Sequence, residues 1–172
     1  MRLRNFVRNE EMQFSPIQIN ELVRNVAHLV KAEAHWQNLP LKLELHGPLP
    51  DTLGDRVLLE QVVLNLVRNA IEAMQQTEPD KRKLLVSTSM PDENHIQLDV
   101  SDTGHGITAD NLAQIFDPFF TTKSDGMGMG LAISRSIIDA HGGNLTARTN
   151  QEGGTTFSFS MRVDNTERNH DS

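Results

Sequence analysis

Two glycine-rich segments occur in the second half of the chain, and both adjoin residues with a regular hydrophobic pattern. The first, 102–106 (Asp-Thr-Gly-His-Gly), directly follows the strand-like segment 97–101. The second, 126–131 (Gly-Met-Gly-Met-Gly-Leu), opens an amphipathic helix. Glycine lets the backbone turn tightly and approach a ligand, and amides at a helix N-terminus bind anions. The two segments therefore predict an anion-binding site, although flexible loops also use glycine.

Asp102 stands where the strand-like segment ends and the first glycine turn begins. A carboxylate at the floor of an apolar pocket accepts a hydrogen bond from the exocyclic amine of adenine, whereas guanine presents a carbonyl at that edge. Asp102 is therefore a candidate for selecting adenine, and Gly104 and Gly106 would allow close approach to the ring. Taken alone, Asp-Thr-Gly is better explained as a turn that joins two elements.

Asn65 and Asn69 lie four residues apart in a strongly apolar helical segment, so they share one face of the helix. A side-chain carbonyl is a suitable ligand for Mg²⁺, which takes few protein ligands beside phosphates and waters. A single asparagine is more simply explained as a hydrogen-bonding residue of the fold. The pair, with apolar neighbours, favours a magnesium site at Asn69.

The segment 116–120 (Phe-Asp-Pro-Phe-Phe) lies between the two glycine runs. It either anchors a long loop or forms the hinge and docking patch of a lid that closes over a nucleotide. Lys123 would then meet phosphate, although a solvated charge explains it equally well. A dinucleotide-binding fingerprint is disfavoured, because residues 119–123 before the second run lack a buried strand pattern.

Hydrophobic spacing predicts alternating helices and strands along most of the chain. Ser15-Pro16 reads as the cap and first residue of a helix. The expected helices are 15–36, 55–75, 109–115 and 131–140, and the expected strands are 41–45, 84–90, 96–100, 145–149 and 155–163. Hairpins mixed with helices favour an α+β two-layer sandwich, in which one mixed sheet carries helices packed on one face.

The ends of the chain differ in composition from its middle. Residues 1–14 carry too little apolar surface for an independent helix, so we expect the end of a longer helix there. Residues 15–163 are expected to form the folded domain, and 164–172 a disordered polar tail.

Composition limits the function classes. The formal net charge of -7 provides no electrostatic footprint for nucleic acid or an anionic membrane. The absence of cysteine excludes disulfides and thiolate metal sites, and no apolar run reaches the roughly 18–20 residues that span a bilayer. The seven histidines show no zinc-ligand spacing.

Taken in order, four segments resemble the sequence boxes of the catalytic and ATP-binding domain of bacterial sensor histidine kinases. Residues 55–73 are similar to the N box, 102–107 to the first glycine box, 116–123 to the phenylalanine box and 126–131 to the second glycine box. Residues 141–144 and 153–157 are similar to the closing segment. The likeness covers about residues 15–163, and Phe-Thr-Thr-Lys at 120–123 is similar to the nitrogen-regulatory type.

The resemblance implies the Bergerat, or GHKL, fold, with ATP bound under a mobile lid. By position, Asn69 would bind Mg²⁺ and Asp102 the adenine amine, with Gly104 and Gly106 lining the base pocket. The phosphate-facing end of the lid would comprise Gly126, Gly128, Gly130 and Leu131. Asn65 and Lys123 are the candidate catalytic residues. Some relatives carry a phosphate-contacting lysine where this chain has Glu72.

The implied activity is ATP-dependent transfer of the γ-phosphoryl to a histidine on a dimerisation domain, from which a response regulator takes it. The family's phosphoacceptor motif is His-Glu or His-Asp on a helix, and we expect none in this sequence, because its one such pair, at 170–171, lies in the polar tail. Residues 1–14 resemble the end of the dimerisation helices that carry this motif, so we expect the catalytic half of a larger sensor, with the membrane attachment of the parent left open. The fragment itself is expected to be monomeric and cytoplasmic, without contact to nucleic acid or membrane.

Two other functions are compatible with the same segments. The first is an ATP-driven clamp of the same fold class. Such clamps resemble this chain but carry a carboxylate at the position of Asn65, and that carboxylate activates water. Asparagine is a poor general base, so steady ATP hydrolysis is disfavoured. A non-catalytic nucleotide-sensing module is the second alternative. The serine-kinase anti-sigma factors resemble histidine kinases more closely, but the phenylalanine box and residues 1–14 favour the histidine kinase.

Overall fold

The computed structural model describes residues 11–36, 39–121 and 129–166. Strands and helices alternate irregularly along the chain, as hairpins and single helices do in α+β proteins. The elements are β1 (Ser15–Ile17), α2 (Ile19–Trp36), β2 (Leu41–Leu45), β3 (Thr52–Gly54), α3 (Arg56–Ala73), the 3₁₀ turn η1 (Pro79–Lys81), β4 (Leu84–Asp92), β5 (His95–Asp102), α4 (Ala109–Leu112), α5 (Gly130–Ala140), β6 (Asn144–Thr149) and β7 (Thr155–Arg162).

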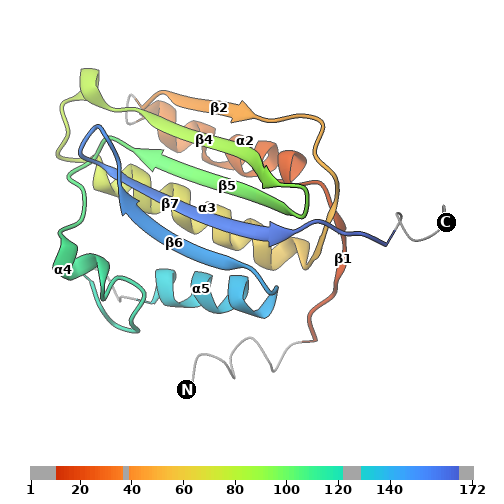
Figure 1. The fold of residues 1–172 in the computed structure, drawn as a ribbon. Helices are drawn as coiled ribbons and strands as arrows, with labels where there is room; N and C mark the ends of the chain where they lie inside the picture. Colours follow the sequence, from red (N-terminus) through yellow and green to blue (C-terminus); the bar gives the residue numbers. More distant parts are fainter. Residues whose placement is uncertain (1–10, 37–38, 122–128, 167–172) are drawn as a thin grey trace.

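Five strands form one mixed sheet in the order β2-β4-β5-β7-β6. β2 runs parallel to β4, and every other neighbouring pair is antiparallel. Helices α2, α3 and α5 lie behind this sheet and leave its other face open (Figure 1). This arrangement confirms the α+β two-layer fold with a mixed sheet and helices on one face.

Strand β5 shows how the sequence sorts the two faces of the sheet. Ile96, Leu98, Val100 and Asp102 are buried, whereas the residues between them are only partly buried. Because successive side chains of a strand point to opposite faces, these four share the face that packs against the helices. The apolar stripe thus ends in a carboxylate, at Asp102.

Helix α3 is the central element of the helical layer. Its buried residues are Leu59, Val62, Val63, Leu66, Val67, Ala70 and Ile71. The carboxylate of Asp55 caps its N-terminus by accepting a hydrogen bond from the Leu58 N–H at 3.2 Å. Burial of the apolar face of α3, rather than its helix propensity, provides most of the stability of this helix.

A second, two-stranded sheet corrects the expectation for residues 15–17. Ser15 does not cap a helix: β1 pairs with β3, with Pro16 opposite Leu53, and α2 begins only at Ile19. Proline has no N–H and is tolerated on an edge strand as well as at the first turn of a helix. Ser-Pro is thus compatible with either structure, and pairing with β3 decides it.

The same small sheet brings the two ends of the domain together. Thr52 of β3 forms an isolated bridge with Val163, and its hydroxyl donates to the Arg162 carbonyl at 2.7 Å. The N–H of Asp164 donates to the Asp51 carbonyl at 2.7 Å. The chain therefore enters through β1 and leaves after β7 at one corner (Figure 1).

Helix boundaries otherwise follow the predictions closely. Helix α3 ends at Ala73 rather than at 75, and α4 is only the turn Ala109–Leu112, capped by Thr108. Within the described ranges, no helix combines the length and apolar character needed to span a bilayer.

Candidate functional site

One face of α3 carries the residues that the sequence singled out. Asn65 and Asn69 are partly buried, and Ala73 continues their row one turn further on. The first glycine segment packs at this last position, where the His105 N–H donates to the Ala73 carbonyl at 3.3 Å. A Cβ on Gly104 would lie 2.4 Å from that carbonyl oxygen, so only glycine fits there.

The start of α5 packs at the other end of the same row. The Asn65 amide donates to the Ser134 hydroxyl at 3.0 Å, and a Cβ on Gly130 would lie 2.8 Å from Asn65 Oδ1. Asn65 and Ala73 are eight residues apart, or about 12 Å along a helix. The first glycine segment and the end of the second thus meet one face of α3, with Asn69 between them.

Asp102 is buried at the end of β5, with 2% of its surface exposed. Burial raises the pKa of its carboxyl above the ordinary value, and hydrogen bonds from the Gly104 and Thr155 N–H groups oppose that shift. Both N–H groups donate to Oδ1, at 2.8 Å and 3.2 Å. Among the described residues none donates to Oδ2, which leaves that oxygen to accept a hydrogen bond from a ligand.

The turn between β6 and β7 supports Asp102 from behind. The Asn150 amide donates to the Asp102 carbonyl at 2.8 Å. A Cβ on Gly154 would lie 2.1 Å from the same carbonyl oxygen. Gly106, at φ +72°, would place a Cβ 2.4 Å from the Gly153 carbonyl oxygen. These close backbone approaches fix the first glycine segment and the position of the carboxylate.

Residues 54–165 match the family described as histidine kinase-, DNA gyrase B-, and HSP90-like ATPases. The chain belongs to this family. It is 42% identical over 160 residues to the sensor protein FixL of Bradyrhizobium diazoefficiens, a match that covers 93% of this chain and 31% of FixL. It is 31% identical to the sensor histidine kinase ZraS of Escherichia coli, covering 96% of this chain and 35% of ZraS.

Solved structures of histidine kinases share the fold. The catalytic domain of histidine kinase ThkA superimposes with a TM-score of 0.79 at 34% identity, covering 88% of this chain and 97% of that one. Full-length ShkA in complex with AMPPNP gives a TM-score of 0.78 at 30% identity, covering 90% of this chain and 32% of that one. The chain thus has the sequence and fold of the ATP-binding catalytic domain of sensor histidine kinases, and it spans about a third of its curated relatives FixL and ZraS.

The structure brings together the predicted residues that it describes. Asn65 and Asn69 share one face of α3, Gly104 packs at Ala73 of that row, and Asp102 and Gly106 flank Gly104 in the chain. Gly130 meets this row at Asn65, and the partly buried Leu131 packs against the core. Lys123, Gly126 and Gly128 lie outside the described residues. Asn69 and the exposed Glu72 both interact with other groups. The ligand contacts of all these residues stay predictions.

Sequence reasoning missed the residues that hold the site in place. Ser134 of α5 hydrogen-bonds Asn65, while Asn150 and Thr155 hold Asp102. The first of these contacts joins residues 69 positions apart. The only sequence signal was the closing segment 153–157, whose likeness to the family marked the right turn without saying what it contacts.

The phenylalanine segment is anchored at one end and exposed at the other. The Phe116 ring meets Phe157 edge-on, with ring centroids 6.4 Å apart, and the Arg135 guanidinium lies 5.0 Å from the Phe116 ring centroid. Phe119 is 73% exposed and has a positive φ of 66°, which is unusual for a bulky residue. Anchoring of this loop is thus observed at Phe116, and the hinge role stays a prediction.

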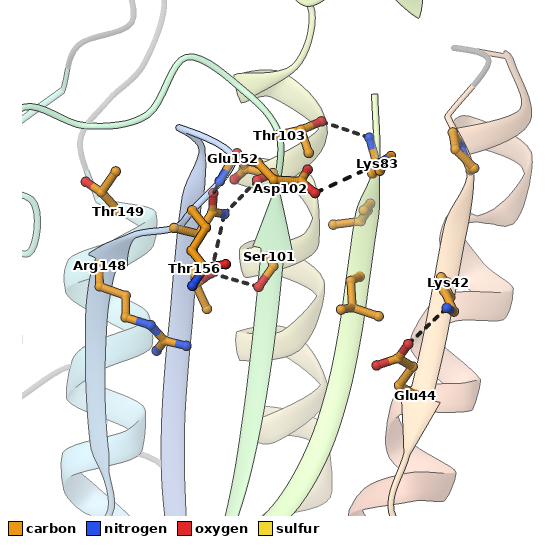
Figure 2. A pocket seen from close by; sticks show the side chains of 15 residues that line it. Lys42, Glu44, Lys83, Ser101, Asp102, Thr103, Arg148, Thr149, Glu152 and Thr156 are labelled. Atoms are coloured by element: carbon orange, nitrogen blue, oxygen red, sulfur yellow. Dashed lines mark hydrogen bonds and ion pairs between the residues drawn. The ribbon is translucent and has the colours of Figure 1, made fainter. Parts of the chain in front are cut away.

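A cavity of about 660 Å³ lies on the open face of the sheet, and its lining includes Asp102 and Thr103 at the end of β5 (Figure 2). Its cations are each close to a carboxylate: Lys42 to Glu44 at 2.9 Å, Lys83 to Glu152 at 3.9 Å, and Arg148 to Asp99 at 3.9 Å. Within each pair the carboxylate offsets the charge of its cation, so the cavity presents no concentrated positive charge to a triphosphate.

Proposed function

We propose that this chain binds ATP on the helical side of the sheet and serves as the catalytic domain of a sensor histidine kinase. The observation that carries this proposal is the placement of Asp102. Its buried carboxylate ends the apolar stripe of β5 beside a glycine turn that packs directly on α3, one helical turn from Asn69. A purine bound there would have its triphosphate along the row Ala73-Asn69-Asn65.

Recognition of adenine follows from the hydrogen bonds of Asp102. Oδ1 is occupied by two backbone N–H donors, whereas Oδ2 can accept from the exocyclic amine of adenine. Guanine would place a carbonyl oxygen against the same carboxylate and leave two acceptors facing each other. The site would therefore reject GTP by repulsion as well as by a lost hydrogen bond.

The residues present fit a magnesium ion that is bound mainly through phosphate. The described residues contain no group of three His, Cys, Asp or Glu that could hold a metal. Mg²⁺ commonly takes one or two protein oxygens beside phosphates and waters, and the Asn69 carbonyl oxygen is such a donor. The ion would neutralise the phosphate charge.

In the proposed reaction the bond between the γ-phosphorus and its bridging oxygen breaks, ADP leaves, and the phosphorus bonds to an imidazole nitrogen of a dimerisation domain. The chain's own contribution would be to position the nucleotide and to offset charge, with Asn65 and Lys123 at the phosphate end. A response regulator would then accept the phosphoryl group. ThkA, whose structure with the response regulator TrrA covers 94% of this chain at 29% identity, supports that partner.

The proposal extends to the organisation of the parent protein. We propose that residues 1–14 lead out of a dimerisation helix, 15–163 form the catalytic domain and 164–172 a tail. Of the first segment, the described residues 11–14 are not helical, and Gln13 hydrogen-bonds Asp55 of the catalytic domain. The isolated chain would be monomeric, and the parent's kinase part would work in the cytoplasm, where ATP is available.

A chimaera tests this function. The region of FixL that matches this chain would be replaced by residues 1–172, and transfer of labelled γ-phosphate to histidine would be measured with Mg²⁺ present. We expect acid-labile label on the chimaera and none on the isolated chain, which should nevertheless bind ATP in calorimetry. Asp102→Ala and Asn69→Ala chimaeras are the matched controls and should lose the label.

The outcomes separate the alternatives. Steady release of phosphate by the isolated chain would favour a clamp-type ATPase. ATP binding without transfer in the chimaera would favour a nucleotide-sensing module. Unchanged ATP affinity in both single variants would refute the site.

A further inference from the structure

His141 directly follows α5 and is partly buried. Its Nδ1 lies 2.7 Å from the Ile137 carbonyl oxygen, and its Nε2 lies 3.0 Å from the Asp55 backbone nitrogen. A carbonyl can only accept a hydrogen bond and a backbone N–H can only donate one. These two partners therefore require an imidazole that is protonated on Nδ1 and unprotonated on Nε2, which is its neutral form.

Three segments of the chain meet at this ring. Asp55, the N-cap of α3, also accepts a hydrogen bond from the Gln13 N–H at 3.0 Å through Oδ2. The ring of Phe14 lies 5.2 Å from the His141 ring, centroid to centroid. A Cβ on Gly54 would come within 2.9 Å of the imidazole, so glycine is needed for this contact. The end of α5, the start of α3 and the N-terminal segment are thus joined here.

Both helices extend from this junction to the proposed nucleotide site. The first residue of α5, Gly130, abuts Asn65 of α3, and Ser134 hydrogen-bonds the same asparagine. Helix α5 has eleven residues, so its two ends are about 16 Å apart. A shift of α5 at His141 therefore moves the residues that meet Asn65, because a short helix moves as a rigid body.

We infer that His141 is a positioning residue that holds α5 against the start of α3 beside the N-terminal segment. It does so only as the neutral imidazole. Acidification therefore loosens this junction and weakens nucleotide binding. Protonation of Nε2 places an N–H against the Asp55 N–H, which turns an attraction into a repulsion. This inference rests on the proposed nucleotide site for its functional consequence, but the junction itself does not.

The groups around the ring set the direction of its titration. Burial lowers the pKa of His141 below the ordinary 6.5, while the Ile137 carbonyl and the Asp55 carboxylate oppose that shift. Asp55 is the charged group that faces the ring from α3, and Asp139 of α5 is exposed. Gly54 of β3 and Phe14 of the N-terminal segment do not titrate. The junction is therefore intact at neutral pH, and it opens as the pH falls below about 6.5 and through the lowered pKa of His141.

Two substitutions separate the hydrogen bond from the titration. In His141→Gln, the side-chain carbonyl oxygen can occupy the place of Nε2 and accept from Asp55, and it does not titrate. In His141→Asn, the shorter amide can reach the Ile137 carbonyl but not Asp55. His95→Gln is the control, since His95 is a partly exposed histidine paired with Asp92 at the far end of β5.

The first measurement is ATP affinity by calorimetry, with Mg²⁺ present, at pH 7.5 and at pH 5.5. The γ-phosphate also titrates in this range, so the readout is the ratio of each variant's dissociation constant to that of the unsubstituted chain at the same pH. We expect His141→Asn to bind about fivefold more weakly at pH 7.5, as for one lost hydrogen bond. His141→Gln should match the unsubstituted chain at pH 7.5 and exceed its affinity by about fivefold at pH 5.5.

The second measurement does not depend on nucleotide. The ¹⁵N chemical shifts of the His141 ring report its tautomer and its pKa directly. We expect a protonated Nδ1 and an unprotonated Nε2 at pH 7.5, with a pKa of His141 below the ordinary value. The Nε2–H tautomer, or a pKa at or above the ordinary value, would overturn the inference even if a variant failed to fold.

The two proposals can fail separately. If the unsubstituted chain binds no ATP at pH 7.5, the proposed function fails, and the ring shifts still decide the junction. If it binds ATP and His141→Gln shows the same acid weakening as His95→Gln, the nucleotide site stands and the role of His141 is refuted.

Discussion

At the scale of single residues, Asp102 shows how burial and hydrogen bonding divide one carboxylate into two functions. Oδ1 accepts two backbone N–H groups and fixes the turn, while Oδ2 is left for a ligand. Burial of this group is unfavourable for its charged form, which is why its pKa is raised. A hydrogen-bond donor supplied by the proposed nucleotide would offset part of this desolvation cost.

Asp102→Asn tests this division. The amide oxygen can replace Oδ1 and accept from both N–H groups, but an NH₂ group then replaces Oδ2 and repels the adenine amine. We expect ATP affinity to fall by about tenfold to a hundredfold, measured by calorimetry. Because the pKa of Asp102 is raised, the ionised carboxylate destabilises the nucleotide-free fold once the pH rises through that pKa. The melting temperature of the nucleotide-free variant at pH 7 should therefore equal or exceed that of the unsubstituted chain.

Asp99→Asn is the control for this experiment. It makes the same change in charge on the same strand, but on the open face, and should leave ATP affinity within about twofold. Equal ATP affinity for Asp102→Asn and Asp99→Asn would remove Asp102 from the site.

At the scale of elements, the site depends on contacts that join parts of the chain far apart in sequence. The turn between β6 and β7 carries no proposed ligand contact, yet Asn150, Gly154 and Thr155 all touch Asp102. Likewise, Ser134 of α5 is buried where it accepts from Asn65 of α3. Asp102 and Asn65 are thus each held by residues for which no ligand contact is proposed.

The contact between α3 and α5 can be measured by a double-mutant cycle. Ser134→Ala and Asn65→Ala should each lower the free energy of unfolding in urea by about 1 kcal/mol. The double variant should lose about 0.5–1 kcal/mol less unfolding free energy than the two single losses added together, because each substitution removes the same hydrogen bond. Ser136→Ala, on the same helix, is the control, and strict additivity between Ser134 and Asn65 would contradict the contact.

Gly154→Ala tests the support behind Asp102. Its Cβ would lie 2.1 Å from a backbone oxygen, which cannot give way as a flexible side chain can. We expect a loss of about 1–3 kcal/mol in unfolding free energy, with weaker ATP binding as Asp102 shifts. Gly47→Ala, where a Cβ meets nothing within 4 Å, should show neither effect.

At the scale of the whole molecule, a single core connects the helical layer with the sheet. Buried residues of α3 and of strands β4, β5 and β7 belong to one cluster that includes Leu66, Val86, Val100 and Phe159. A ligand that contacts both β5 and α3 therefore stabilises the complete fold rather than one element.

Thermal unfolding should report this stabilisation. At ATP–Mg²⁺ concentrations about a hundredfold above the dissociation constant, linkage adds about 2.7 kcal/mol, which corresponds to roughly 5–10 °C for a chain of this size. Removing Mg²⁺ with EDTA should reduce the shift, and Asn69→Ala should make the remaining shift insensitive to EDTA. An EDTA effect of equal size in Asn69→Ala would exclude Asn69 as the magnesium ligand.

Local patterns were enough to predict most of the fold, whereas the candidate site residues were chosen through the likeness of four ordered segments to the family. Helix α3 has a long apolar repeat, and β5 alternates strictly, so both were predictable along with the positions of Asn69 and Asp102. Strands β1 and β3 have three residues each and no alternation to detect, so their pairing depends on the folded chain. The contact of His141 with Asp55 spans 86 residues, and neither residue carries a local sign of the other.

The corner formed by β1, β3 and the end of β7 also bears on how such a domain is reused. Because Ile17 of β1 and Val163 after β7 both pair with Thr52 of β3, the first and last strands of the domain lie close together. The proposed nucleotide row lies elsewhere, along α3. Neighbouring modules can be spliced onto either side without stretching the scaffold between them. An exchange of flanking domains at this corner is thus compatible with an unaltered row of candidate residues on α3.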